Sequence, residues 1–193
     1  MKYDFLNLEE QKALQRWHQW LNDNRGDRAR LRRGERPEDI LLTDAFFHFL
    51  QRMPKSWIGE QLFFTSAAVA GLVSHVKEDT QTLSRGYQSK SDNKPPKMAS
   101  FAEQLAMPVK GKNPPMSELR FQQLQKSRTT DEFYHRVLQA IRLLNGKVNI
   151  SSLASNIIHW HREFNNQIDR EPTKRLSVQW ATDYFTALSK ETK

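Results

Sequence analysis

Apolar residues recur every three or four positions along most of the chain, which is the spacing of one face of an α-helix. Near the N-terminus, Leu14, Trp17 and Leu21 follow this spacing, with Ala13 and Trp20 beside them. No stretch alternates convincingly between apolar and polar residues, as a half-buried strand does. The pattern therefore predicts an all-α protein that begins with an amphipathic helix.

Three further helices are expected in the first half of the chain. A short helix from Asp27 to Arg33 should be closed by Gly34 and by Pro37, because proline cannot continue the helical hydrogen-bond ladder. Thr43 is a good N-cap for a mostly enclosed helix that ends at Pro54. The segment from Trp57 to Val76 is apolar nearly all round, as expected of the central helix of a bundle.

The second half is also expected to be helical. A small helix is predicted around Ser100 to Ala106. Four more helices should start at Ser117, at Thr130, at Ser151 or Ser152, and after Pro172.

Two polar segments interrupt the helical pattern. Residues 77–98 carry Gly86, Pro95 and Pro96 and lack a hydrophobic period, so a loop is expected there. Lys110 to Pro115 is a second cluster of helix breakers. We therefore expect two helical-bundle subdomains, residues 1–110 and 111–193, joined by a polar region that contains proline and lysine.

Positive charge is concentrated in one part of the chain. Thirty Lys plus Arg against 22 Asp plus Glu give a net charge of +8, which points to nucleic acid, an anionic membrane or an acidic partner. The densest run, Arg25 to Arg36, consists largely of arginine. A guanidinium presents a planar fork of donors that matches two phosphate oxygens. On a helix, Arg28 and Arg32 lie one turn apart, and Leu31 is directed elsewhere as an anchor.

We interpret this run as a polyanion-binding surface rather than as a merely solvated helix face, because further basic residues recur in the second half. The residues predicted to bind nucleic acid are Arg25, Arg28, Arg32, Arg33, Arg120, Lys126, Arg128, Arg136 and Arg142. The five tryptophans could stack on bases. Most of them occupy apolar helix positions, however, so core packing is the favoured interpretation.

Several function classes are disfavoured by the composition. The chain has no cysteine, which excludes disulfides, thiolate metal sites and a cysteine nucleophile and favours a reducing compartment, with cytoplasm as the expectation. The N-terminus lacks the apolar stretch of a secretory signal. The apolar run from Leu62 to Val73 is shorter than the roughly 20 residues that span a bilayer.

No catalytic or cofactor motif is found. His159 and His161 lie two apart on an expected helix, so their side chains diverge and cannot hold one metal ion. One of them is expected to be packed and the other solvated. No glycine-rich phosphate loop or zinc motif occurs, and the acidic residues are scattered. We therefore expect a protein that is not an enzyme and that uses no cofactor and no metal.

Several sequence motifs occur in the order found in one known family. They are Trp17-x-x-Trp20-Leu21, the run from Arg25 to Arg33, Leu41 to Phe46, Ser100 to Ala102, Ser117 to Leu124, Asp131 to Leu138 and Val148 to Ala154. With them the chain resembles the CasB-type small subunit (Cse-two family) of type I-E CRISPR Cascade. The sequence departs from that family at Glu103 and Gln104, where a more basic helix is expected, and in a long 77–98 loop.

The resemblance implies an all-α fold of two helical subdomains and a non-catalytic, sequence-independent role in binding. The implied partners are the crRNA and target DNA, including the displaced non-target strand, the backbone and large subunits of Cascade, and a second copy of the chain. Three other hypotheses stay open on the residues alone: a helix-turn-helix regulator, a basic helical scaffold for acidic subunits, and a nuclease.

Overall fold

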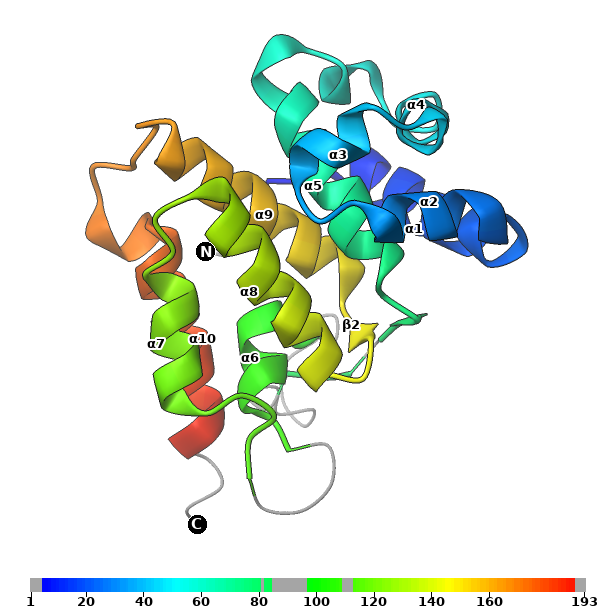
Figure 1. The fold of residues 1–193 in the computed structure, drawn as a ribbon. Coiled ribbons are helices and arrows are strands. Elements are labelled where there is room, and N and C mark those ends of the chain that lie inside the picture. The colour runs from blue at the N-terminus through cyan, green and yellow to red at the C-terminus, as the bar shows by residue number, and fades with distance from the viewer. Residues whose placement is uncertain (1–4, 81, 85–96, 109–112, 190–193) are drawn as a thin grey trace.

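The computed structural model describes residues 5–80, 82–84, 97–108 and 113–189, and it confirms the all-α class (Figure 1). The α-helices in these residues are α1 (Leu8–Asp23), α2 (Arg25–Arg33), α3 (Pro37–Leu41), α4 (Asp44–Leu50), α5 (Glu60–Ser74), α6 (Phe101–Ala106), α7 (Glu118–Gln125), α8 (Thr130–Leu143), α9 (Ile150–Phe164) and α10 (Leu176–Ser189). Two 3₁₀ helices, η1 (Lys55–Trp57) and η2 (Pro172–Lys174), precede α5 and α10.

Helix α1 directs the expected apolar stripe into the core. Leu14, Trp17 and Leu21 are each no more than 1% exposed. A capping box fixes the first turn: the Asn7 side chain accepts a hydrogen bond from the Glu10 backbone N–H, and the Glu10 carboxylate accepts one from the Asn7 backbone N–H. The predicted amphipathic helix is therefore confirmed.

The helices that follow differ from the prediction at their ends. Helix α2 begins at Arg25, two residues earlier than expected. Gly34 is its C-cap, as predicted. Pro37 does not close it but starts α3, since the N–H groups of a first turn have no partner within the helix and proline is tolerated there.

Thr43 caps α4 as predicted, and its Oγ1 accepts a hydrogen bond from the Phe46 backbone N–H at 3.2 Å. The helix ends at Leu50, before Pro54 is reached. Phe47 is half exposed, so α4 is enclosed on fewer sides than its sequence indicated.

Helix α5 is the central helix, as predicted, and packs against α2, α3, α4, α8 and α9. Trp57, its expected first residue, is instead the last residue of η1, and α5 itself starts after Gly59. Side chains of neighbouring helices come very close to the α-carbon of Gly71. A Cβ atom there would overlap the Tyr134 hydroxyl oxygen and lie 3.1 Å from Ile40, so any side chain at this position would force its neighbours to move.

Two short strands, β1 (Glu78–Asp79) and β2 (Lys147–Val148), form a parallel pair in which Glu78 lies opposite Lys147. The sequence pattern did not predict them, because two residues are too few to show an alternation. Gly146, with a φ of +77°, turns the chain into β2. The pair joins the segment after α5 to the segment after α8.

The C-terminal helices pack through aromatic rings. Phe121 of α7 stacks on Tyr184 of α10 with ring centroids 4.0 Å apart. Phe133 of α8 stacks on Trp160 of α9 at 4.1 Å. Helix α6 packs mainly against α10, and also against α9.

The helix starts in the second half agree in part with the prediction. Ser100 and Ser117 occupy the N-cap positions of α6 and α7. The cap of α8 is Thr129, one residue before the expected Thr130. The cap of α9 is Asn149 rather than Ser151 or Ser152, because the Asn149 Oδ1 accepts from the Ser152 backbone N–H at 3.0 Å.

The tryptophans confirm the preference for core packing. Trp17, Trp57, Trp160 and Trp180 are at most 7% exposed, whereas Trp20 is half-buried beneath Arg52, whose guanidinium carbon lies 3.8 Å from the ring centroid. The buried apolar side chains form one connected cluster that includes residues of both halves.

The division into subdomains at residue 110 stays a prediction. Most of the polar segment 77–98 and the residue Lys110 itself lie outside the described residues.

Among the described residues, no helix has the length and the apolar composition that crossing a membrane requires.

Candidate nucleic-acid interface

Helix α2 carries the arginine run, and its buried side fixes how the arginines are presented. Leu31 is fully buried, and Asp27 is 9% exposed. The helix packs on α4 and α5 through that side. Arg25, Arg32 and Arg33 are exposed, and Arg28 is half-buried. Leu31 is therefore the anchor that the sequence predicted.

Arg28 and Arg32 contact the backbone at the C-terminal end of α5. The Nε of Arg32 donates to the Ser74 carbonyl oxygen at 2.8 Å. Arg28 donates to the Val76 carbonyl oxygen at 3.5 Å and to the Asn22 side chain at 3.0 Å. These contacts hold the two guanidinium groups side by side at the point where the central helix ends.

Partial burial affects both cations. Loss of solvation lowers the pKa of Arg28 and of Arg32, and the charge of Arg32 lowers the pKa of Arg28 further. The Nε of Arg28 is buried and has no hydrogen-bond partner among the described residues. An anion bound here would relieve the repulsion between the two like charges.

His75 connects these arginines to helix α8. Burial lowers the pKa of His75 to about 4, and the nearby charges of Arg32 and Arg142 lower it further. The imidazole is therefore neutral at pH 7, and its Nε2 is a buried atom without a partner among the described residues. Arg32 and Arg142 therefore both act on His75, one from α2 and the other from α8.

Arg142 also lines a pocket of about 400 Å³ between α7 and α8, together with Arg120 and Arg136. Arg120 and Arg142 are exposed and form no ion pair within the described residues. Arg136 is partly neutralised, since it pairs with Glu132 at 2.5 Å and also donates to the Gln123 carbonyl oxygen.

The structure thus brings five of the nine predicted residues into one group, which we call the arginine strip: Arg28, Arg32, Arg142, Arg136 and Arg120. Arg142 joins its two parts. The other four predicted residues are exposed, and their side chains have no described contact with the strip: Arg25, Arg33, Lys126 and Arg128. The backbone N–H of Arg128 donates to Glu132, the ion-pair partner of Arg136.

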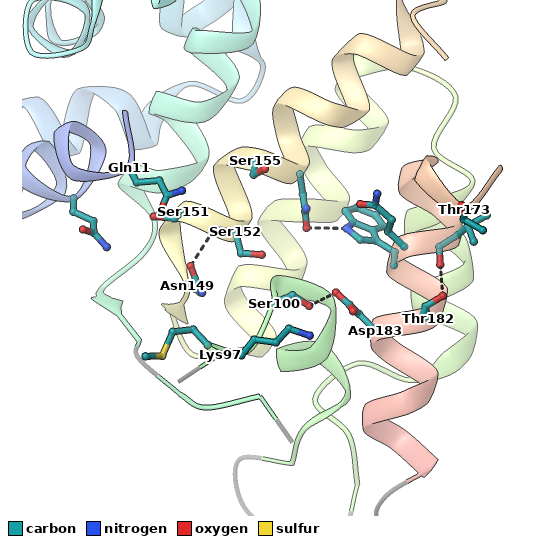
Figure 2. A pocket seen from close by; sticks show the side chains of 16 residues that line it. Gln11, Lys97, Ser100, Asn149, Ser151, Ser152, Ser155, Thr173, Thr182 and Asp183 are labelled. Carbon is teal, nitrogen blue, oxygen red and sulfur yellow. Dashed lines mark hydrogen bonds between the residues drawn. The ribbon is translucent and has the colours of Figure 1, made fainter. Parts of the chain in front are cut away.

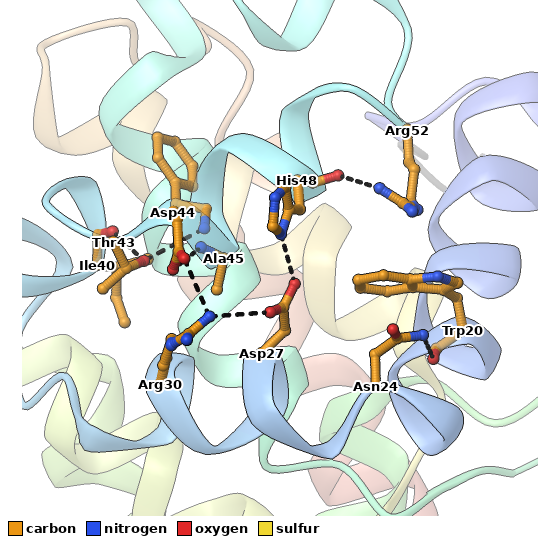
Figure 3. Close-up of polar contacts among 11 residues, drawn as sticks. Trp20, Asn24, Asp27, Arg30, Ile40, Thr43, Asp44, Ala45, His48 and Arg52 are labelled. Atoms are coloured by element: carbon orange, nitrogen blue, oxygen red, sulfur yellow. Dashed lines mark hydrogen bonds and ion pairs between the residues drawn. The ribbon is translucent and has the colours of Figure 1, made fainter.

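Arg30, which the sequence did not select, is directed toward acids instead (Figure 3). It lies 3.0 Å from Asp44 and 3.4 Å from Asp27, and Asp27 also lies 2.7 Å from His48. Asp27 lies one turn before Arg30, so the sequence contained a signal for this neutralisation. His75 was missed, because a lone histidine after an apolar helix carries no recognisable pattern.

The two histidines of α9 differ from the prediction. Both are buried: His159 is 4% exposed and His161 is 3% exposed. His159 lies 3.0 Å from Glu163, whereas His161 lies among the rings of Phe64 and Phe133, where burial lowers its pKa to about 4. The prediction that one of the two histidines is solvated is therefore wrong. Within the residues that the structure describes, no group of histidine and acidic side chains could hold a metal ion.

Comparison with protein-family models matches residues 27–185, well over half of the chain, to a family described as CRISPR-associated protein Cse2. The match includes nearly all of α2 and the whole of the α7–α8 pocket. Comparisons with curated proteins and with solved structures found no match.

Proposed function

The chain belongs to the Cse2 family of CRISPR-associated proteins, and on that premise we propose that it binds nucleic-acid backbones without reading their sequence. Membership makes it a small subunit of a type I-E Cascade complex. In the proposed role it is non-catalytic. It steadies the R-loop formed by guide RNA and target DNA, and it holds the displaced DNA strand.

The arginine strip is the observation that carries this proposal. Guanidinium groups from α2, α7 and α8, far apart in the sequence, are gathered around His75 and the α7–α8 pocket. Arg32, Arg120 and Arg142 have no ion-pair partner among the described residues. Such side chains bind phosphates through charge, and phosphate contacts carry no direct information about the base sequence.

Modest contacts of this kind are sufficient for the proposed role. An R-loop exchanges one duplex for another of about equal stability, so a few backbone contacts can decide the balance. Each phosphate that the strip neutralises should contribute about 0.7 to the slope of log affinity against log salt for a single strand.

The proposed partners are the crRNA and the target DNA, the backbone and large subunits of Cascade, and a second copy of the chain. The proposed compartment is the cytoplasm, where such complexes meet nucleic acid.

The proposal is tested by titrating fluorescently labelled single strands of unrelated sequence into the purified protein at two salt concentrations. Similar affinities that fall steeply with salt support it. Affinity for one duplex sequence would instead favour a helix-turn-helix regulator. Absence of nucleic-acid affinity, with assembly into the complex retained, would favour a basic scaffold. Metal-dependent cleavage of the strands would indicate a nuclease.

A further inference from the structure

A groove of about 900 Å³ lies among α1, α9, α10 and the segment that leads into α6 (Figure 2). It shares no lining residue with the α7–α8 pocket. Figure 2 shows Gln11, Ser151 and Ser155 at one end of the groove and Ser100, Thr182 and Asp183 at the other. The groove is therefore a second concave surface, separate from the arginine strip.

Amide and hydroxyl groups dominate the lining of this groove. Asp183 and Lys97 are the charged members among the described residues that line it, and their charges are opposite. A nucleic-acid backbone brings one negative charge per nucleotide and requires several cations. The lining is thus poorly suited to nucleic acid, although the protein carries a net charge of +8.

Several of these polar groups have hydrogen-bonding capacity left over. The Oγ of Ser152 accepts from the Phe101 backbone N–H at 2.9 Å, so the hydroxyl hydrogen of Ser152 remains to donate. Asn156 Oδ1 accepts from the Trp180 indole at 2.8 Å, and its amide nitrogen has no partner among the described residues. The Oγ of Ser151 is buried without any partner there. Polar groups in this state favour a ligand that supplies both donors and acceptors.

The far end of the groove holds a fixed anion. The Ser100 hydroxyl donates to Asp183 Oδ2 at 2.6 Å, and Ser100 itself is 3% exposed and caps α6. One carboxylate oxygen is thereby oriented by the fold. The other, Oδ1, has no hydrogen-bond partner among the described residues and is available to a cation.

We propose that the groove binds an extended polypeptide segment of another Cascade subunit. An extended peptide backbone alternates N–H and C=O groups without net charge, which matches the mixed amide and hydroxyl lining. One lysine or arginine of that segment pairs with Asp183. The inference rests on membership of the complex and not on the proposed binding of nucleic acid.

Site-specific photo-crosslinking in the assembled complex tests the assignment. A benzophenone amino acid is placed at Gln179, which lines the groove, and as a control at Thr186, which is exposed on α10 outside it. From position 179 we expect a product that resists nuclease and that maps to one continuous stretch of another subunit containing a lysine or arginine. A nuclease-sensitive product, a product with a second copy of this chain, scattered attachment points, or equal labelling from both positions would overturn the proposal.

Replacement of the carboxylate gives an independent measurement. Asp183→Asn keeps an oxygen that can accept from Ser100, so the fold contact survives while the charge is removed. We expect this variant to join the complex about tenfold more weakly, whereas single-strand affinity is unchanged. Asp169→Asn, outside the groove, serves as the matched control. Normal assembly of Asp183→Asn, or a parallel decrease in single-strand affinity, would contradict the inference.

Discussion

The Nε atom of Arg32 lies 2.8 Å from the backbone oxygen of Ser74, so an arginine of the most basic helix caps the C-terminal end of α5. The last carbonyl groups of a helix lack partners within it and carry partial negative charge. These carbonyl groups therefore attract the guanidinium of Arg32 and hold it in place before any ligand arrives. Arg28 approaches the Val76 carbonyl oxygen in the same way, at 3.5 Å.

The first prediction concerns the two exposed arginines at the end of α2. Arg32→Ala combined with Arg33→Ala should weaken binding to single-stranded DNA, by about 1–3 kcal/mol for each hydrogen bond between a guanidinium and a phosphate that the substitutions remove. Helical content should stay as in the parent protein, since Leu31 remains as the anchor. Fluorescence anisotropy and circular dichroism measure the two quantities.

Arg30→Ala is the matched control in the same helix, because Arg30 is already paired with Asp27 and Asp44. It should change DNA affinity far less than the double substitution. A decrease about half as large as that of the double substitution would show that general charge, and not the placement of Arg32 and Arg33, determines binding, because Arg30→Ala removes one charge and the double substitution removes two.

The second prediction concerns Arg142, which joins the two parts of the arginine strip. Arg142→Gln should reduce the slope of log affinity against log salt by about 0.7 for a single strand, the contribution of one phosphate contact. Arg128→Gln, which removes an exposed arginine outside the strip, should leave a slope closer to that of the parent. The measurement is a series of titrations from low to high salt. An unchanged slope for Arg142→Gln would remove this residue from the interface.

A third prediction follows from the position of His75 between two cations. Its pKa is about 4, lowered first by burial and then by Arg32 and Arg142. A bound polyanion neutralises those two charges, so the pKa of His75 should rise, although burial keeps it below the ordinary value of 6.5. By linkage, binding should strengthen as the pH falls from 6.5 toward 4. NMR titration of the His75 ring with and without a short oligonucleotide measures the shift, and coincident curves would argue against binding at this place.

The fourth prediction concerns stability at acidic pH. His161 has a pKa of about 4 in the folded chain, below its ordinary value of 6.5, because it is buried. The unfolded chain therefore binds more protons than the folded one between these values, and stability falls as the pH drops through this range. The decrease in the free energy of unfolding attributable to His161 at pH 4 should be about 3 kcal/mol.

His161→Phe should remove that part of the pH dependence, because a phenyl ring has no proton to gain. Urea unfolding at pH 7 and pH 4.5 compares the variant with the parent protein. The same fall in stability in both proteins would assign the acid sensitivity to other groups, such as His18, whose pKa burial also lowers.

The fifth prediction uses two glycines in helices. Gly71→Ala places a methyl group against the Tyr134 hydroxyl and Ile40 and should destabilise the protein by about 1–3 kcal/mol. Gly26→Ala, which meets nothing within 4 Å, should be neutral or stabilising by up to about 1 kcal/mol, since alanine favours the helix. Thermal unfolding measures both, and equal behaviour of the two variants would contradict the close packing at Gly71.

The sequence contained enough information for most of the helices, because helical periodicity is a local property. The stripe of α1, the cap at Thr43 and the central helix α5 follow from residues a few positions apart. Helix ends were less predictable. Pro37 is compatible with either the end of one helix or the start of the next, and the packing of α3 against α5 selects the second.

The candidate interface could be predicted as a set of residues but not as an arrangement. Charge and residue type selected Arg28, Arg32 and Arg142, whereas their proximity depends on how α2, α5 and α8 pack. Burial of both α9 histidines could not be read from their spacing either, since it depends on Glu163 for one and on aromatic neighbours for the other. Interactions between distant segments thus determine which arginines lie close together and which histidines are buried, and local sequence patterns do not contain this information.

Because the guanidinium groups of Arg32 and Arg28 contact carbonyl oxygens at the end of α5, a ligand that binds these groups should also restrict the motion of that helix end. Capture of a strand should slow amide hydrogen exchange in the last turn of α5, deep beneath the surface that the strand touches. A label placed far from the ligand could therefore report its arrival.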